Sequence, residues 1–264
     1  MEDRPELPVA GEWFAVRPVT GRTAMLTEPH VDPLLRANVW YLRGRDRDLV
    51  LDSGNGVGEL GRALARLAHG RRRELVCLAT HAHVDHIGGF HEFSRRLLHP
   101  AEEPVAAFAF SIAPLHPPSW PQEAYDEIAD GGFVPAPLLV DATPYPGFDP
   151  EAFRITPAAP THAVREGDEL ELGGRRLTVL ELPGHTPGSV GLVDHEERAL
   201  LSGDAVYDGG LIDTLAESDR DAYARTMERL LRLDVDVVYP GHGEPFGRRR
   251  LRELAAAYLG DRDG

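Results

Sequence analysis

The sequence contains no lysine, so all 28 of its basic residues are arginines. Enzymes that form Schiff bases, attach pyridoxal phosphate or bind phosphates through a Walker loop require a lysine amine, and these classes are therefore excluded. Cysteine is almost as scarce, because Cys77 is the only one in 264 residues. Internal disulfides and thiolate zinc clusters are excluded with it. Cys77 lies in an apolar run, and we expect it to be a small buried hydrophobic residue.

Positive charge is scarce relative to negative charge, with 28 basic and 43 acidic residues and a net charge of −15. Such a protein repels phosphate backbones and anionic lipid surfaces, so we expect neither nucleic acid nor a membrane as partner. The sequence also lacks an apolar run long enough to span a bilayer, and its opening residues do not resemble a secretory leader. We therefore expect a cytoplasmic protein that acts on a small molecule. Its oligomeric state stays open.

The rest of the composition is that of a globular protein, with 42% apolar and 27% charged residues. The length favours a single domain over residues 1–264. Hydrophobic periodicity predicts strands at 38–42, 49–52, 74–79, 169–172, 176–182, 189–193, 199–201 and 235–239. It predicts helices at 60–68, 122–129, 219–233 and 248–259. Two strand-rich halves that each carry helices indicate two sheets packed face to face, with helices outside.

Residues from about 100 to 160 differ in character, because prolines alternate with aromatic residues such as Trp120 and Phe133. We interpret this segment as an irregular insertion, with the helix at 122–129 as its one regular element. An aromatic lid suits a substrate with an acyl chain or another apolar portion.

The densest polar cluster follows the strand at 74–79 and reads Thr80-His81-Ala82-His83-Val84-Asp85-His86. On an extended segment alternate side chains share a face, so His81 and His83 can bind one metal ion together. A helix that begins just afterwards would carry Asp85 and His86 to a second, adjacent position. Imidazole and carboxylate ligands without sulfur suit zinc, iron or manganese.

This segment resembles the His-x-His-x-Asp-His motif of the metallo-β-lactamase superfamily. Other motifs of that family stand in the same order: Leu51-Asp52-Ser53-Gly54, Pro183-Gly184-His185, Ser202-Gly203-Asp204 and Gly241-His242-Gly243. The resemblance covers the chain from about residue 38 to residue 242. It implies an αβ/βα four-layer sandwich with the metal ions at the sheet edges.

The resemblance also implies the roles of the ligand residues. The first metal ion would be held by His81, His83 and His185, the second by Asp85, His86 and His242, and Asp204 would bridge the two. We expect two divalent ions, with zinc favoured over iron or manganese. Two such ions lower the pKa of a shared water to near neutrality, so a metal-bridging hydroxide would be the nucleophile.

Further residues are candidates for supporting roles. We expect Asp85 to orient the attacking water and shuttle its proton, and Tyr207 to donate a hydrogen bond to the substrate carbonyl or leaving group. Asp52 is expected to accept a hydrogen bond from a ligand histidine, and Thr80 and Ser202 to serve similarly. His30 and His116 are candidates to line the pocket.

Several substrate classes share this ligand set. The presence of both His86 and Asp204 argues against a β-lactam-hydrolysing enzyme, and the acidic, lysine-free chain argues against RNA. Glyoxalase II relatives carry a helical extension after the last histidine, whereas only residues 243–264 follow it here. The spacing of Asp204 and Tyr207 is similar to that of acyl-homoserine lactonases, and the longer stretch from Gly203 to Asp213 is similar to acyl-CoA thioesterases.

We therefore expect a hydrolase of a carboxyl-type bond, with a thioester favoured. A lactone hydrolase and an iron-dependent enzyme of sulfur or oxygen redox chemistry are the alternatives, and a binding protein without catalysis is a third. Metal content would separate the redox enzyme from the hydrolases.

Overall fold

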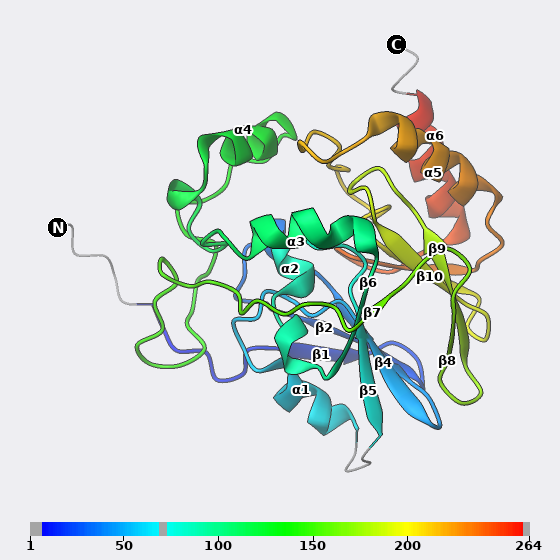
Figure 1. The fold of residues 1–264 in the computed structure, drawn as a ribbon, viewed down its shortest axis with the longest axis horizontal. Coiled ribbons are helices and arrows are strands. Elements are labelled where there is room, and N and C mark those ends of the chain that lie inside the picture. The colour runs from blue at the N-terminus through cyan, green and yellow to red at the C-terminus, as the bar shows by residue number, and fades with distance from the viewer. Residues whose placement is uncertain (1–6, 69–72, 261–264) are drawn as a thin grey trace.

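The strands of the computed structural model, which describes residues 7–68 and 73–260, form two sheets packed face to face (Figure 1). The first sheet has the order β1-β2-β3-β4-β5-β6-β7 and the second has the order β13-β12-β11-β10-β9-β8. The first sheet contains β1 (Ala15–Pro18), β2 (Thr23–Thr27), β3 (Val39–Arg43), β4 (Arg47–Leu51), β5 (Glu74–Leu78), β6 (Arg95–Leu98) and β7 (His162–Ala163). The second contains β8 (Glu169–Glu171), β9 (Arg176–Glu181), β10 (Val190–Asp194), β11 (Ala199–Gly203), β12 (Val237–Pro240) and β13 (Phe246–Gly247).

Helices cover the outer faces of both sheets (Figure 1). The first sheet is covered by α1 (Leu60–Leu67), α2 (Val84–Ile87) and α3 (Glu103–Ala109), and the second by α5 (Arg220–Arg232) and α6 (Arg248–Gly260). The remaining helix, α4 (Gln122–Asp130), stands apart from the sheets. The predicted αβ/βα four-layer sandwich is confirmed.

Three apolar cores separate the four layers, and the strands supply them by simple alternation. In β3, Val39 and Tyr41 pack toward the helices, whereas Trp40 and Leu42 pack between the sheets. Successive strand residues point to opposite faces, so a strand covered on both sides reads as a continuous apolar run. Cys77 is buried in the same way, as expected.

The predicted strands and helices are confirmed to within a few residues, but five short strands and one helix were not predicted. The strands β1, β2, β6, β7 and β13 carry polar residues or contain no more than five residues. The helix α3 lies inside the segment that we expected to hold α4 alone, and that part of the expectation is wrong. Its residues Val105, Ala106 and Ala109 are buried against the first sheet's outer core, so tertiary packing stabilises a helix in a proline-rich context.

The single-domain expectation for 1–264 stays a prediction, and the terminal residues of that range lie outside the described ones. Among the helices of the described residues, none has the length and apolar character that crossing a bilayer requires.

One buried arginine joins the two sheets. Arg175 lies between β8 and β9, and its Nε donates to the Asp194 carboxylate at 2.7 Å. Its other nitrogens reach the first sheet, where they donate to the Arg22 carbonyl at 2.8 Å and to Thr23 Oγ1 at 2.7 Å. Neither charged side chain of the Arg175–Asp194 pair is exposed.

Replacing Arg175 with alanine should lower the free energy of unfolding by about 3–5 kcal/mol, because the Asp194 charge stays buried without its partner. Urea denaturation followed by tryptophan fluorescence measures this change. Arg176→Ala is the matched control, since the neighbouring Arg176 pairs with Glu169 on the surface and should contribute less than about 1 kcal/mol. Equal losses in the two variants would contradict a special role for the buried pair.

Candidate metal centre

The predicted ligand residues lie in the segments that follow four strands, on loops except for Asp85 and His86, which lie in α2. His81 follows β5, His185 follows β9, Asp204 follows β11 and His242 follows β12. Within the sheets β4 runs parallel to β5, and β11 runs parallel to β12. The carboxyl ends of parallel strands meet at one edge of a sheet, and ligand sites in α/β folds gather there. The structure brings all seven predicted ligands together at one edge of the sandwich.

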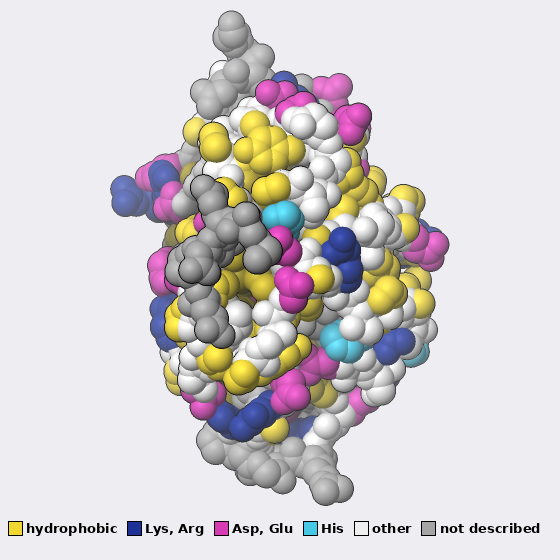
Figure 2. Space-filling model, turned by 90° about the vertical axis from the view of Figure 1, so that its left-hand side faces the viewer, with side chains coloured by type: hydrophobic (Ala, Val, Ile, Leu, Met, Phe, Trp, Pro, Cys, Tyr) yellow, Lys and Arg dark blue, Asp and Glu magenta, His cyan; other side chains and the backbone are white. Residues whose placement is uncertain are grey.

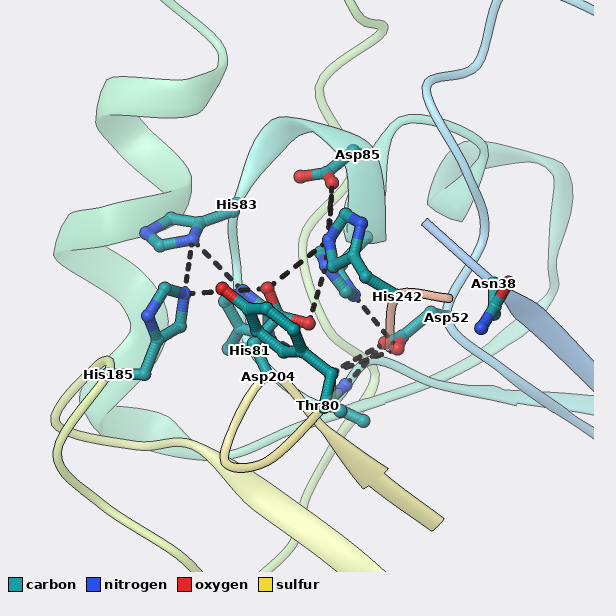
Figure 3. Close-up of polar contacts among 12 residues, drawn as sticks. Asn38, Asp52, Thr80, His81, His83, Asp85, His185, Asp204 and His242 are labelled. Carbon is teal, nitrogen blue, oxygen red and sulfur yellow. Dashed lines mark hydrogen bonds and ion pairs between the residues drawn. The ribbon is translucent and has the colours of Figure 1, made fainter. Parts of the chain in front are cut away.

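Three histidine rings form the first half of this cluster. His81 Nε2 and His185 Nε2 each lie 3.0 Å from His83 Nδ1. Figure 3 shows the three rings turned toward one another. One nitrogen from each ring therefore faces a common point, as three ligands of one metal ion would.

The outward nitrogens of these rings are also held. Thr80 Oγ1 lies 3.1 Å from His81 Nδ1. Glu217 Oε1 lies 2.9 Å from His83 Nε2, and the Ile212 carbonyl lies 2.9 Å from His185 Nδ1. Such contacts fix the ring orientation and the tautomer of a metal ligand.

Two carboxylates and two histidines form the second half. Asp85 Oδ2 lies 3.3 Å from His242 Nε2 and 3.6 Å from His86 Nε2. Asp204 lies between the two halves, as Figure 3 shows. Its Oδ1 is 3.4 Å from His86 Nε2. Its Oδ2 is 3.3 Å from His242 Nε2 and 3.7 Å from His185 Nε2. Asp204 is thus placed to share its two oxygens between two cations.

Two buried atoms in this cluster need a partner. His86 Nε2 and Asp204 Oδ1 are buried, and neither has a hydrogen bond within the described part of the chain. They lie 3.4 Å apart as an ion pair that is not a hydrogen bond, and buried polar atoms without a hydrogen bond are costly and rare in native proteins. Both atoms point into the cluster of imidazole nitrogens and carboxylate oxygens, so two metal ions that prefer such donors fit this site.

Charge divides the cluster into two halves. Burial and the neighbouring imidazoles hold the pKa of His81 well below its ordinary value and lower the pKa of His185 to about 4. Burial also opposes protonation of His242, but the Asp204 and Asp85 carboxylates outweigh it and raise the pKa to about 10. His81 and His185 therefore offer neutral imidazoles. Burial also opposes protonation of His83, but the Glu217 carboxylate outweighs it and raises the pKa of that ring. The second half releases protons when cations bind.

Asp52 and Thr80 support the second half, as predicted. Asp52 Oδ2 lies 2.9 Å from His86 Nδ1, which leaves His86 Nε2 to face the cluster. The Thr80 backbone N–H donates to Asp52 at 2.7 Å and its hydroxyl at 3.0 Å. Asp52 adopts a φ of 62°, a strained conformation for a residue other than glycine that surrounding contacts must hold. The expectation for Ser202 is wrong, since its hydroxyl donates to the Val206 carbonyl at 2.8 Å.

Two carboxylates that no sequence motif marks, Glu217 and Glu102, contact the ligand segments. Glu102 is fully buried and accepts the Ala82 N–H at 2.8 Å and the Gly188 N–H at 2.7 Å. Ala82 lies between two ligand histidines, and Gly188 lies in the loop of the third. One side chain from the start of the 100–160 segment thus joins two ligand loops, although nothing in its local sequence indicates this.

A cavity of about 200 Å³ lies against the ligand atoms. One wall is polar and includes His83, Asp85, His185, Asp204 and His242. The rest is largely apolar and comes from α3, α4 and nearby loops: Leu34, Leu35, Val105, Phe108, Ile112, Trp120, Ile128, Phe133, Ile212 and Leu215. His30 and His116 do not line this cavity, and His30 instead faces Asp141.

Hydrophobic side chains also show on the outside of the 100–160 segment, on the side of the molecule that faces the reader in Figure 2. Val134 is 84% exposed and Phe108 is 46% exposed. The helix α4 carries no buried residue. The helix α4 therefore covers the cavity without being packed as tightly as the sheets, whereas α3 of the same segment is anchored in the core.

Tyr207 lines the cavity, three residues after Asp204. Its ring centroid lies 5.6 Å from that of His242. Its hydroxyl donates to the Gly210 carbonyl at 2.7 Å. Burial, with the Asp204 charge beside it, raises the pKa of Tyr207, so the hydroxyl stays protonated and can donate a hydrogen bond.

Comparison with known proteins gives one family. The sequence pattern of the metallo-beta-lactamase superfamily matches residues 32–242. The acyl-coenzyme A thioesterase MBLAC2 of Homo sapiens is 36% identical over 94% of this chain and 88% of its own length, and that of Gallus gallus is 37% identical over 94% and 87%. A metallo-beta-lactamase family protein from Thermus thermophilus superposes with a TM-score of 0.64 at 24% identity, over 93% of this chain and 81% of its own.

The seven ligand-type residues that gather at the sheet edge belong to this matched region, and both the motifs and the four-layer fold agree with it. The chain is therefore a metal-dependent hydrolase that belongs to the metallo-beta-lactamase superfamily.

Proposed function

We propose that this chain hydrolyses the thioester bond of acyl-CoA with two metal ions at the described cluster. The observation that carries the proposal is the apolar cavity that ends against two adjoining ligand groups. An acyl chain in the cavity would bring its carbonyl carbon to the polar wall. The acyl-CoA thioesterases similar to this chain over most of its length support the same substrate class.

The two metal ions would be held as the motifs predict, with His81, His83 and His185 at one, Asp85, His86 and His242 at the other, and Asp204 between them. We propose zinc, which imidazole and carboxylate ligands suit, with iron or manganese as the alternatives. When bound, the two ions would make a hydroxide nucleophile available at neutral pH and polarise the thioester carbonyl.

The side chains of the cluster would orient the reacting groups. Asp85 has one oxygen 3.3 Å from His242 Nε2 and also lines the cavity, so it is placed to orient the attacking water and accept its proton. Tyr207 would turn its hydroxyl from Gly210 toward the substrate and donate to the developing oxyanion. A thiol has a pKa of about 8.5, so the thiolate is a good leaving group that can depart without a proton from the protein and take one from water afterwards.

Replacing His83 or Asp204 with alanine should abolish turnover of acyl-CoA and lower the metal content, because each variant loses a metal ligand. The bound metal ions would stabilise the charge of the transition state by several kcal/mol. We expect a rate loss of at least about a thousandfold. Elemental analysis and a thiol-release assay measure both effects. His195→Ala is the control, since this exposed histidine contacts Thr178 away from the cluster. Full activity in either ligand variant would refute the two-metal centre.

Replacing Tyr207 with phenylalanine should lower kcat by about 10²-fold and leave the metal content unchanged, since the hydroxyl is proposed to contact the substrate and not the metals. Steady-state kinetics with a saturating acyl-CoA, together with elemental analysis, test this. A loss below about threefold would limit Tyr207 to packing its loop through Gly210.

Replacing Phe133 with alanine should raise KM for a long-chain acyl-CoA by roughly tenfold or more, because burying such a side chain contributes about 1.5–3 kcal/mol. Contacts equal in the ground and transition states affect KM and not kcat. Acetyl-CoA turnover and metal content should stay nearly unchanged. Val134→Ala is the matched control, since the next residue is exposed and does not line the cavity. Collapse of acetyl-CoA turnover would place the segment in the catalytic core.

A further inference from the structure

Glu217 is the one carboxylate that contacts the three-histidine half of the cluster, among the described residues, without belonging to the predicted ligand set. Its Oε1 lies 2.9 Å from His83 Nε2, the ring nitrogen that faces away from His81 and His185. The opposite nitrogen, His83 Nδ1, lies 3.0 Å from the Nε2 atoms of both other rings. Glu217 therefore touches the outer side of a ring whose inner side faces the metal position.

The direction of this hydrogen bond follows from the chemistry of the two groups. An ionised carboxylate can only accept, so the proton of a neutral His83 ring must sit on Nε2. The lone pair is then left on Nδ1, where the metal ion would be. Without Glu217, Nδ1 and Nε2 would compete for the proton, and the ring would have more freedom to turn.

The loop that carries Glu217 holds a second predicted ligand, His185, as well. The Ile212 carbonyl lies 2.9 Å from His185 Nδ1, and the Ser218 hydroxyl donates to the His185 carbonyl at 2.8 Å. The loop thus fixes the outer sides of two of the three histidines. Ile212 and Glu217 line the substrate cavity as well.

We propose that Glu217 is a positioning residue that sets the tautomer and orientation of His83, and so the metal affinity of the three-histidine site. The proposal rests on the two-metal centre proposed above. The side chain of Glu217 is 28% exposed, and that of His83 is 20% exposed. Water therefore reaches this pair, but water alone would not fix the tautomer and orientation of the His83 ring as the carboxylate does.

The test is cobalt binding to metal-free wild-type protein, Glu217→Ala and Glu217→Gln, with a chromophoric chelator as competitor. Loss of such an outer partner lowers metal affinity by about 10- to 100-fold. We expect that loss at one of the two sites in Glu217→Ala, together with a changed visible spectrum of the bound cobalt. Glu217→Gln should lie between it and wild type, because an amide oxygen still accepts the bond but carries no charge.

Glu127→Gln is the matched control. Glu127 lines the same cavity from α4, and within the described residues it makes no hydrogen bond or ion pair to a histidine of the cluster. Glu127→Gln removes one negative charge from the cavity wall, as Glu217→Gln does, and should leave the cobalt affinities of both sites unchanged. Wild-type affinity at both sites in Glu217→Ala would overturn the proposal, as would an equal loss in Glu127→Gln.

The cobalt affinities are measured independently of folding and of catalytic activity. The melting temperatures of the metal-free proteins show whether the variants fold, and the isosteric Glu217→Gln carries the test if Glu217→Ala does not. No thioester enters the experiment. A wild-type protein that binds two cobalt ions but hydrolyses no acyl-CoA would refute the proposed substrate and leave the role of Glu217 intact.

Discussion

Asp85 and Asp204 turn their carboxylates toward the same small space at the edge of the sandwich, and both are buried. Two like charges removed from water repel each other strongly, and they can stay together only where positive charge or protons lie between them. Here His86 and His242 lie within 3.6 Å of these carboxylates. The carboxylates raise the pKa values of His86 and His242, so protonated imidazoles can supply this positive charge, and metal ions would supply it in their place.

Close backbone contacts supply part of that support. A Cβ atom on Gly88 would lie 2.1 Å from the carbonyl carbon of Asn55, and one on Gly241 would lie 2.1 Å from Asp204 Oδ1. No side chain fits at either position, so the loops that carry Asp85 and His242 can approach their neighbours only because these residues are glycines. Glu102 adds a second kind of support, since its carboxylate satisfies backbone N–H groups in two ligand loops.

The parts of this site that could be predicted from the sequence are those that the chain encodes locally. His81, His83, Asp85 and His86 stand within six residues, and the glycines around His185, Asp204 and His242 mark their loops. Glu102 and Glu217 lack such a signal, because each reaches the cluster only through the fold. The same holds for α3, because the surrounding prolines obscure its helical pattern and its apolar face is buried only by packing against the first sheet. The strands β1, β2, β6, β7 and β13 were missed for a related reason: such short strands are stabilised largely by pairing with their neighbours in the sheet.

The residues that hold the ligands and the residues that line the cavity are partly the same. The loop from Ile212 to Ser218 contacts the outer sides of His83 and His185 and also forms one wall of the cavity. Glu102 similarly begins the segment that carries Trp120 and Phe133 and holds two ligand loops. A change in the loop from Ile212 to Ser218 should therefore alter both the cavity and the orientation of His83 and His185, because packed side chains transmit such shifts. Phe133 lines the cavity with an apolar side chain that cannot hold a ligand residue by a hydrogen bond, so a change there should act on substrate binding without altering the metal ligands.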